Sequence, residues 1–164
     1  MGKIKFEDNL AYPYQKEKIE VRGCSNPFKI YYKIKGIMKD VLELSGKDIF
    51  EIKLKWDATS EDRSFWVKWS ADRKIDIWTK LNVTITISGS QNANTKKGDI
   101  AVSITPLYIT EVDVGFIKKI FWWIYYLLHY KKKRIRDFYY AKNLINKLKI
   151  EIGKVYGVEV PESK

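Results

Sequence analysis

Apolar residues recur at every second position over long stretches of the first two thirds of the chain. The most regular stretch runs from Ile75 to Ile87, where polar residues and Trp78 fill the positions between. This alternation is typical of a strand with one packed and one wet face, as in antiparallel sheets. Shorter runs with the same period predict further strands at residues 4–6, 18–22, 49–56, 65–69 and 100–108.

Two of these strands carry specific expectations. In the strand over residues 49–56, strict alternation places Phe50, Ile52, Leu54 and Trp56 on one face. In the last strand, Pro106 cannot donate a backbone hydrogen bond, so it marks a sheet edge or a bulge.

Two other stretches repeat every three or four positions, as helices do. The first begins with Asn26 and Pro27, a capping residue and a residue favoured at the first helical position, and ends at Ser45-Gly46. The second fills residues 114–152 and would measure about 58 Å as one straight helix. Because a domain of this size is narrower than that, we expect a bend near residues 131–136.

The order of elements predicts a single α+β domain over residues 1–156, followed by a mobile tail over residues 157–164. We expect an antiparallel sheet of about five or six strands. A short helix from the first half and the long C-terminal helix should pack on one face, because an apolar sheet face needs a cover.

This order of elements over residues 17–152 resembles that of the helix-grip proteins, the START and Bet v1-like ligand-binding families. The resemblance implies a curved sheet whose last helix closes an apolar cavity, and hence an apolar ligand. No motif of those families is present, so no site residue is carried over. An unrelated two-layer α+β sandwich fits the same order equally well.

Positive charge is concentrated in the last third of the chain. The net charge is +11, and residues 114–154 hold eleven lysines and arginines against two acids, which makes +9. The remaining residues contribute only +2. Such asymmetry favours an anionic partner, although a solvated helix face explains it too.

Aromatic residues are concentrated in the same segment. A helical projection separates an aliphatic stripe, expected to bury against the sheet, from a face of rings and cations. The stripe comprises Ile117, Ile120, Phe121, Ile124, Leu127 and Leu128. The candidate binding residues are Trp122, Trp123, Tyr126, Tyr130, Lys119, Lys131, Lys132, Lys133, Arg134 and Arg136.

Four interpretations of this second face remain open. Its rings are buried between layers or in a homo-oligomer, they meet an anionic membrane, they bind nucleic acid through Lys131 to Arg136, or they hold a protein partner. The apolar run from Ile120 to Tyr130 would be about 16 Å of helix, too short to cross a bilayer core of about 30 Å. We therefore expect a binding protein with no transmembrane segment.

Residues for catalysis are scarce. The chain has one histidine, His129, and one cysteine, Cys24, and it shows no metal-ligand spacing or glycine-rich phosphate loop. The acids Asp57, Glu61 and Asp62 cluster at a predicted turn, where solvation of the hairpin explains them. We predict no catalytic site, metal or cofactor.

Two further features complete the expectations. Trp66 with Lys68, and Trp78 with Lys80, share the outward side of their strands, an arrangement that suits stacking on single-stranded nucleic acid or simple packing. The single cysteine and the absence of a signal-peptide pattern at the start favour a cytoplasmic protein, peripheral to the membrane if it docks there.

Overall fold

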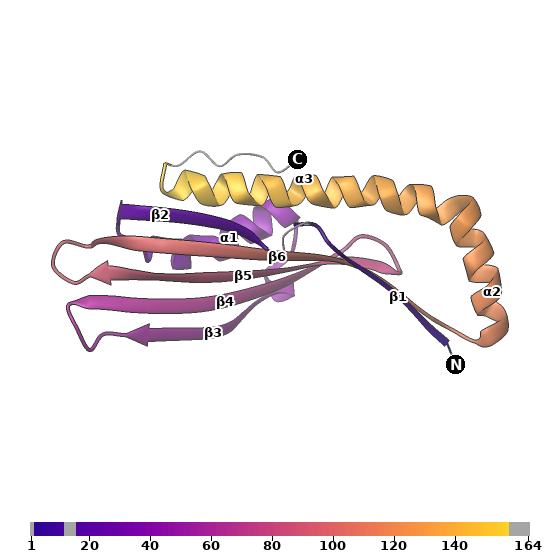
Figure 1. The fold of residues 1–164 in the computed structure, drawn as a ribbon, viewed down its shortest axis with the longest axis horizontal. Helices are drawn as coiled ribbons and strands as arrows, with labels where there is room; N and C mark the ends of the chain where they lie inside the picture. Colours follow the sequence, from indigo (N-terminus) through magenta and orange to yellow (C-terminus); the bar gives the residue numbers. More distant parts are fainter. Residues whose placement is uncertain (1, 12–15, 158–164) are drawn as a thin grey trace.

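The computed structural model describes residues 2–11 and 16–157, and Figure 1 shows how their elements are arranged. The chain is an α+β fold, as predicted. One antiparallel sheet of six strands carries the short helix α1 (Lys29–Leu42) and the long helix α3 (Lys131–Val155) on one face. The expected mobile tail falls on residues 157–164, of which all but Gly157 lie outside the described residues.

The sheet has an unusual edge, because two strands share one neighbour. Its order is β1 (Gly2–Asn9), β6 (Lys97–Val114), β5 (Thr79–Asn92), β4 (Asp62–Lys74) and β3 (Ile49–Asp57). Strand β2 (Glu17–Ser25) pairs with the first half of β6, and β1 pairs with its second half. Pro106 lies between these two paired stretches; it is paired with Val83 of β5, but its carbonyl accepts a bond from Leu10 N–H, so its nitrogen also faces away from β5 and no ladder bond is lost.

The core lies between the sheet and the two helices. Alternate residues of β4, β5 and β6 are buried there, as the period of two predicts. From above, α1 contributes Ile30, Ile34, Met38 and Leu42, and α3 contributes Ala141, Leu144, Ile145, Leu148 and Ile152.

The first helix differs from its prediction in its ends. It starts at Lys29, and Asn26 does not act as the predicted cap: it adopts a left-handed conformation (φ 50°) and accepts the Lys29 N–H on its carbonyl oxygen, while Gln91 Oε1 accepts the Phe28 N–H at 3.2 Å. The helix ends at Leu42, and its C-cap Glu43 is also left-handed (φ 54°); the N–H of the next residue, Leu44, donates to the Lys39 carbonyl. The expected stop at Ser45-Gly46 therefore lies two residues beyond the C-cap.

The prediction that Phe50, Ile52, Leu54 and Trp56 share a face is wrong. The pairing of β3 with β4 slips between Glu51 and Lys53, so that Ile52 forms a bulge. Before the bulge, Phe50 lies opposite Ser70 on the open face of the sheet. After it, Leu54 and Trp56 lie opposite Val67 and Phe65, whose side chains are buried beneath the helices. One extra residue thus moved half of the strand to the other face.

Candidate functional site

The last third of the chain bends before the predicted position. Helix α2 (Phe116–Tyr125) continues through a π-helical turn, η2 (Tyr126–Tyr130), into α3. Figure 1 shows α2 turned steeply away from α3 at the end of the molecule where β1 begins. The bend expected near residues 131–136 therefore lies within the five residues before them. A π-helical turn is a recognised place for a helix to change direction.

The aromatic face of α2 is the side that packs against the rest of the molecule. Trp122 and Tyr130 are 6% and 2% exposed, in a small cluster with Ile4 of β1 and Val112 of β6. Around them, Phe6 of β1 stacks on Tyr126 and meets Trp123 edge to face, while the ring of Trp78 meets that of Tyr130 at 5.2 Å. Trp78 therefore packs under the helix and does not form an outward platform with Lys80.

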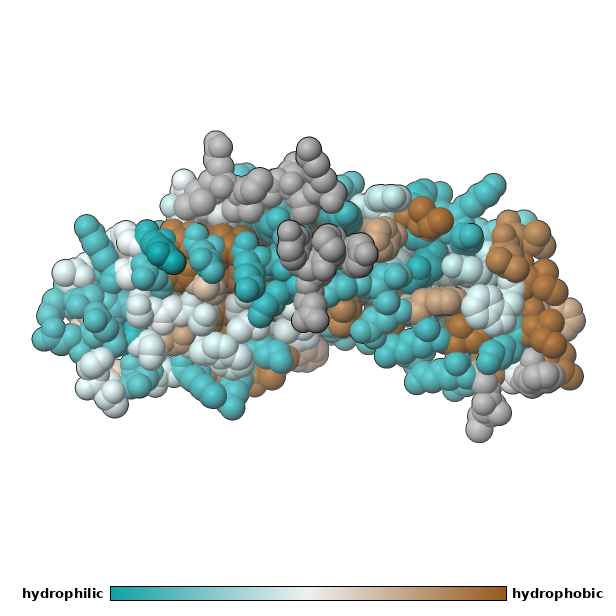
Figure 2. Space-filling model, in the orientation of Figure 1, coloured by the Kyte–Doolittle hydropathy of each residue, from teal (hydrophilic) through white to brown (hydrophobic). Residues whose placement is uncertain are grey.

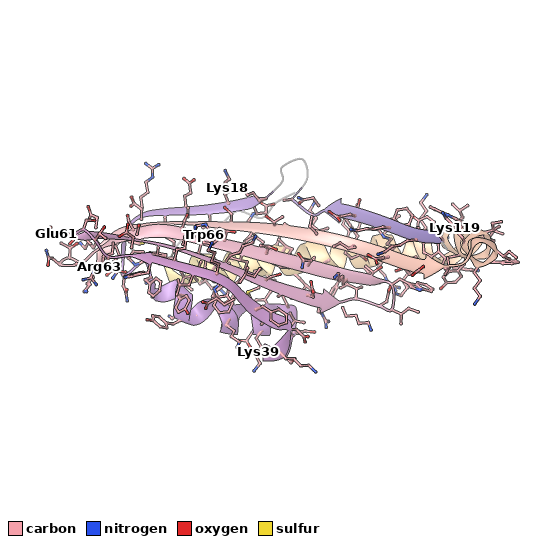
Figure 3. The ribbon with its side chains drawn as sticks, turned by 90° about the horizontal axis from the view of Figure 1, so that it is seen from below. Lys18, Lys39, Glu61, Arg63, Trp66 and Lys119 are labelled. Carbon is pink, nitrogen blue, oxygen red and sulfur yellow. The ribbon has the colours of Figure 1, made fainter. Side chains whose placement is uncertain are left out.

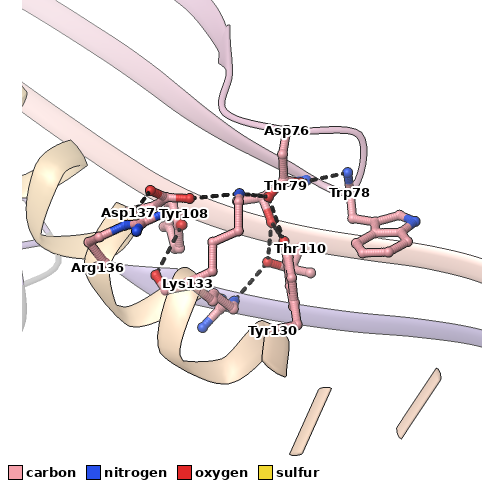
Figure 4. A network of polar contacts seen from close by, with 10 residues as sticks. Asp76, Trp78, Thr79, Tyr108, Thr110, Tyr130, Lys133, Arg136 and Asp137 are labelled. Carbon is pink, nitrogen blue, oxygen red and sulfur yellow. Dashed lines mark hydrogen bonds and ion pairs between the residues drawn. The ribbon is translucent and has the colours of Figure 1, made fainter. Parts of the chain in front are cut away.

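A chain of hydrogen bonds fixes the bend to the sheet (Figure 4). Tyr130 Oη donates to Asp76 Oδ2 at 2.9 Å and lies 2.6 Å from Thr79 Oγ1. Thr79 in turn is 2.7 Å from Thr110, which accepts a bond from Arg134 Nε at 2.7 Å. Because the Tyr130 hydroxyl donates its only proton to Asp76, it must accept from Thr79, and Thr79 must accept from Thr110. The hydrogen bonds of this series therefore all run in one direction, from Arg134 to Asp76.

Two of the candidate cations, Lys133 and Arg134, bind carboxylates within this network. Lys133 Nζ donates to both Asp76 and Asp137 at 2.9 Å, and these carboxylates keep the pKa of Lys133 above its usual value. Arg134 pairs with Asp8 at 2.7 Å, with its side chain only 11% exposed. These two residues hold α3 on the sheet.

The same network sets two pKa values. Burial raises the pKa of Asp76, but the bonds from Lys133, the Trp78 backbone and Tyr130 outweigh burial and leave that pKa below its usual value. Burial raises the pKa of Tyr130 to about 12, helped by the neighbouring Asp76 carboxylate. Both groups therefore keep their charge state near neutral pH.

The remaining candidate cations are more open to solvent. Lys131 and Lys132 are exposed, Lys119 is half-buried, and Arg136 is exposed with Asp137 3.8 Å away. They lie at the two ends of the α2 and η2 segment. Between Phe116 and Arg136 the chain has no acidic residue to offset them.

The aliphatic stripe points away from the sheet, so its predicted burial is wrong. All six of its residues, four on α2 and two on η2, are exposed, with Ile117 at 70% and Leu127 at 66%, and we call them the apolar face of α2. In Figure 2 they form a hydrophobic band over α2 at the end of the molecule. The orientation is reversed because the Tyr130 hydroxyl bonds to Thr79 and Asp76, and α2 lies against β1, beyond the main core.

No protein-family model matches this chain, and neither does any curated protein. Within the described residues, no helix combines the length and apolar character needed to cross a membrane.

The residues considered for catalysis lie apart. His129 is exposed on η2 beside Tyr125, and Cys24 Sγ lies 3.3 Å from the Gly98 carbonyl oxygen. Burial raises the pKa of the Cys24 thiol, the opposite of what a nucleophile needs. In the part of the chain that the structure describes, no group of three or more His, Cys, Asp or Glu residues could hold a metal ion.

One hollow of about 530 Å³ lies between α1 and α3. It is bounded by apolar residues such as Ile37 and Leu144, and by charged residues such as Asp40 and Lys147. Its described walls belong to α1, its neighbour Glu43, and α3, so the hollow lies beside the helices. Between α3 and the sheet, buried residues of α3 and β6 belong to one hydrophobic core cluster.

Proposed function

We propose that the protein binds anionic membrane surfaces, with the apolar face of α2 inserted among the lipid headgroups. The observation that carries this proposal is the exposure of Ile117, Phe121, Leu127 and their neighbours on a helix whose other face is packed. Contiguous apolar patches on a protein surface mark interaction sites, and this one covers a single helical face.

The free energy of burial favours an apolar environment for this face. Fully burying one Leu, Ile or Phe side chain contributes about 1.5–3 kcal/mol. The six residues are half to three-quarters exposed, so their partial burial would contribute several kcal/mol together. A helix with a strong apolar face lies in the plane of the membrane interface rather than across it.

Charge selects lipid over other apolar partners. Lys118 and Lys119 lie at one end of the apolar face, and Lys131 and Lys132 follow its other end. Each lysine near an anionic leaflet contributes about 1 kcal/mol. With no acid between Phe116 and Arg136, the ends of the apolar face complement a negative surface.

The experiment is flotation with liposomes of phosphatidylcholine alone and of phosphatidylcholine with phosphatidylglycerol. The wild-type protein is expected to float with the anionic vesicles, and Phe121→Glu/Leu127→Glu to lose at least about tenfold in affinity, because two buried carboxylates are costly in the interface. Tyr32→Glu/Phe50→Glu is the matched control, since these residues are 76% and 57% exposed on α1 and β3 and the charge change is the same.

Failure of the wild-type protein to bind either vesicle at low salt would exclude the proposal. Equal losses in the two double variants would mean that net charge, and not the apolar face, drives binding. Competition by an oligonucleotide distinguishes the nucleic-acid alternative through Lys131 to Arg136, of which Lys133 and Arg134 are already held by carboxylates.

A further inference from the structure

Strand β3 forms a free edge of the sheet, far from α2. In the described residues, no strand pairs with its outer side. Every residue from Phe50 to Asp57 is exposed, and four of these eight are apolar. An edge strand presents unpaired N–H and C=O groups, which readily pair with another strand.

The bulge at Ile52 leaves a regular segment of five residues, Lys53 to Asp57. In this segment Leu54 and Trp56 lie on the helix-covered side, opposite Val67 and Phe65. The other three, Lys53, Lys55 and Asp57, lie on the open side. Figure 3 looks onto this open side, with α3 behind the sheet and Trp66 labelled on it.

We propose that β3 pairs with β3 of a second copy of this chain, antiparallel and centred on Lys55. In this register Lys53 of each copy lies opposite Asp57 of the other, which makes two ion pairs on the open side. Leu54 of each copy lies opposite Trp56 of the other, which makes two apolar pairs on the covered side. Facing residues of antiparallel strands share a side, so all four pairs are allowed by the pleat.

The side chains of the segment are available for these pairs. Asp57 uses Oδ1 to accept two bonds from Thr59, at 3.0 Å from its N–H and 2.8 Å from its hydroxyl, which leaves Oδ2 for a partner. Those bonds lower the pKa of Asp57, so the carboxylate is charged near neutral pH. Within the described part of the chain, Lys53 makes no ion pair.

The pair of Lys55 residues at the centre is the one unfavourable contact. Each Lys55 ammonium lies 5.6 Å from the centre of its own Trp66 ring, a cation–π contact that draws the charge back over its own sheet. On the covered side, Trp56 meets the Phe28 ring at 4.7 Å, so the partner's Leu54 would extend an existing aromatic cluster.

Other registers fit less well. A pairing centred on Leu54 places Lys53 opposite Lys55 twice, and one centred on Trp56 keeps only three residues within the strand. A register shifted by one residue would pair an apolar residue of the covered side with a lysine of the open side. Facing residues of paired strands must lie on the same side of the sheet, so such registers are excluded. The register centred on Lys55 is therefore the one that satisfies both faces.

Charge exchange tests the ion pairs by sedimentation velocity over a concentration series. The wild-type protein is expected to show a concentration-dependent dimer, and Lys53→Asp and Asp57→Lys each to weaken dimerisation by about tenfold, because both symmetric pairs become repulsive. The combined Lys53→Asp/Asp57→Lys variant restores the pairs with reversed sign and is expected to return near the wild-type affinity. A monomer at all concentrations, or a combined variant weaker than either single one, overturns the proposal.

Cysteine cross-linking tests the register in a Cys24→Ser background. Facing Cα atoms of antiparallel strands are about 4.5–5.5 Å apart, within disulfide range. Lys55→Cys is therefore expected to cross-link under mild oxidation. Lys53→Cys is the matched control, because its symmetry mate would lie about 14 Å along the strand.

Equal rates for Lys55→Cys and Lys53→Cys, or faster cross-linking of Leu54→Cys, would overturn this register. The proposal is independent of the membrane proposal. The Lys53→Asp variant should still float with anionic vesicles, and Phe121→Glu/Leu127→Glu should still dimerise. A dimer lost only in the latter variant would assign self-association to α2 and overturn the proposal for β3.

Discussion

At the scale of single residues, the basic run from Lys131 to Arg136 divides between two roles. Lys133 and Arg134 bind carboxylates of the sheet, while Lys131 and Lys132 face solvent. Neighbouring lysines look alike in a sequence, and their roles differ here because each residue of a helix points about 100° away from the one before it. The partners Asp76 and Asp8 come from strands and turns distant in the chain, so no local pattern identifies them.

The ion pair at Asp76 makes stability depend on pH. The pKa of this carboxyl is lower in the folded protein than its ordinary value of 3.8, so the folded state binds its proton less readily than the unfolded chain does. Its contribution is therefore complete above pH 3.8 and disappears as the pH falls through the lower folded pKa.

Replacing Asp76 tests this dependence. Asp76→Asn is expected to reduce the free energy of unfolding by about 2 kcal/mol at pH 7, since hydrogen bonds to a charged group are lost. Urea unfolding of both proteins from pH 7 down to pH 2.5 should show this difference shrinking below pH 3.8. A difference that stays constant with pH would contradict the assigned charge on Asp76.

At the scale of elements, the periods of the sequence predicted the helices, the two faces of α2 and most of the strands, but residues 75–78 form the turn before β5 and not the start of that strand. They did not predict which face of α2 packs, because a projection separates two faces without locating the core. Both faces of α2 are apolar enough to bury, and the tyrosine hydroxyl of Tyr130 decides between them by reaching Thr79 and Asp76. The bulge at Ile52 was also invisible, since an alternating run contains no mark of an extra residue.

Substituting two leucines of the C-terminal region allows the packed face of α3 to be compared with the exposed apolar face of α2. Leu148 of α3 is fully buried, so Leu148→Ala is expected to cost about 2–5 kcal/mol of unfolding free energy. Leu127 is 66% exposed, and Leu127→Ala should change stability by less than about 0.5 kcal/mol. Chemical denaturation measures both, and a cost at Leu127 similar to that at Leu148 would mean that the apolar face of α2 is packed in solution.

At the scale of the whole molecule, charge and apolar surface are distributed unevenly. The segment over residues 114–154 carries +9 of the total charge of +11, and it also holds the apolar face of α2. The fold class could be predicted from the order of periods alone. The shared edge of β1 and β2 could not, because it depends on how far β6 extends past each partner.

This distribution predicts how vesicle binding responds to salt. Raising the ionic strength from about 0.1 M to about 1 M shortens the screening length from about 10 Å to about 3 Å. Affinity for anionic vesicles in a sedimentation assay is therefore expected to fall several-fold but to persist, because insertion of the apolar face does not depend on charge. An affinity that does not change with salt would mean that the lysines do not contribute to binding. A complete loss of binding at high salt would mean that the apolar face does not contribute.

The number of residues in the π-helical turn at Tyr126–Tyr130 determines how α2 is rotated about its own axis. Each residue added to or removed from a helix rotates everything beyond it by about 100°. With one residue fewer in this turn, α2 would revolve about its own axis, lifting Trp122 out of its cluster and turning some aliphatic residues inward. The five-residue length of this turn thus decides whether the aliphatic or the aromatic face of α2 meets solvent. Small insertions or deletions there would change that surface more than most substitutions.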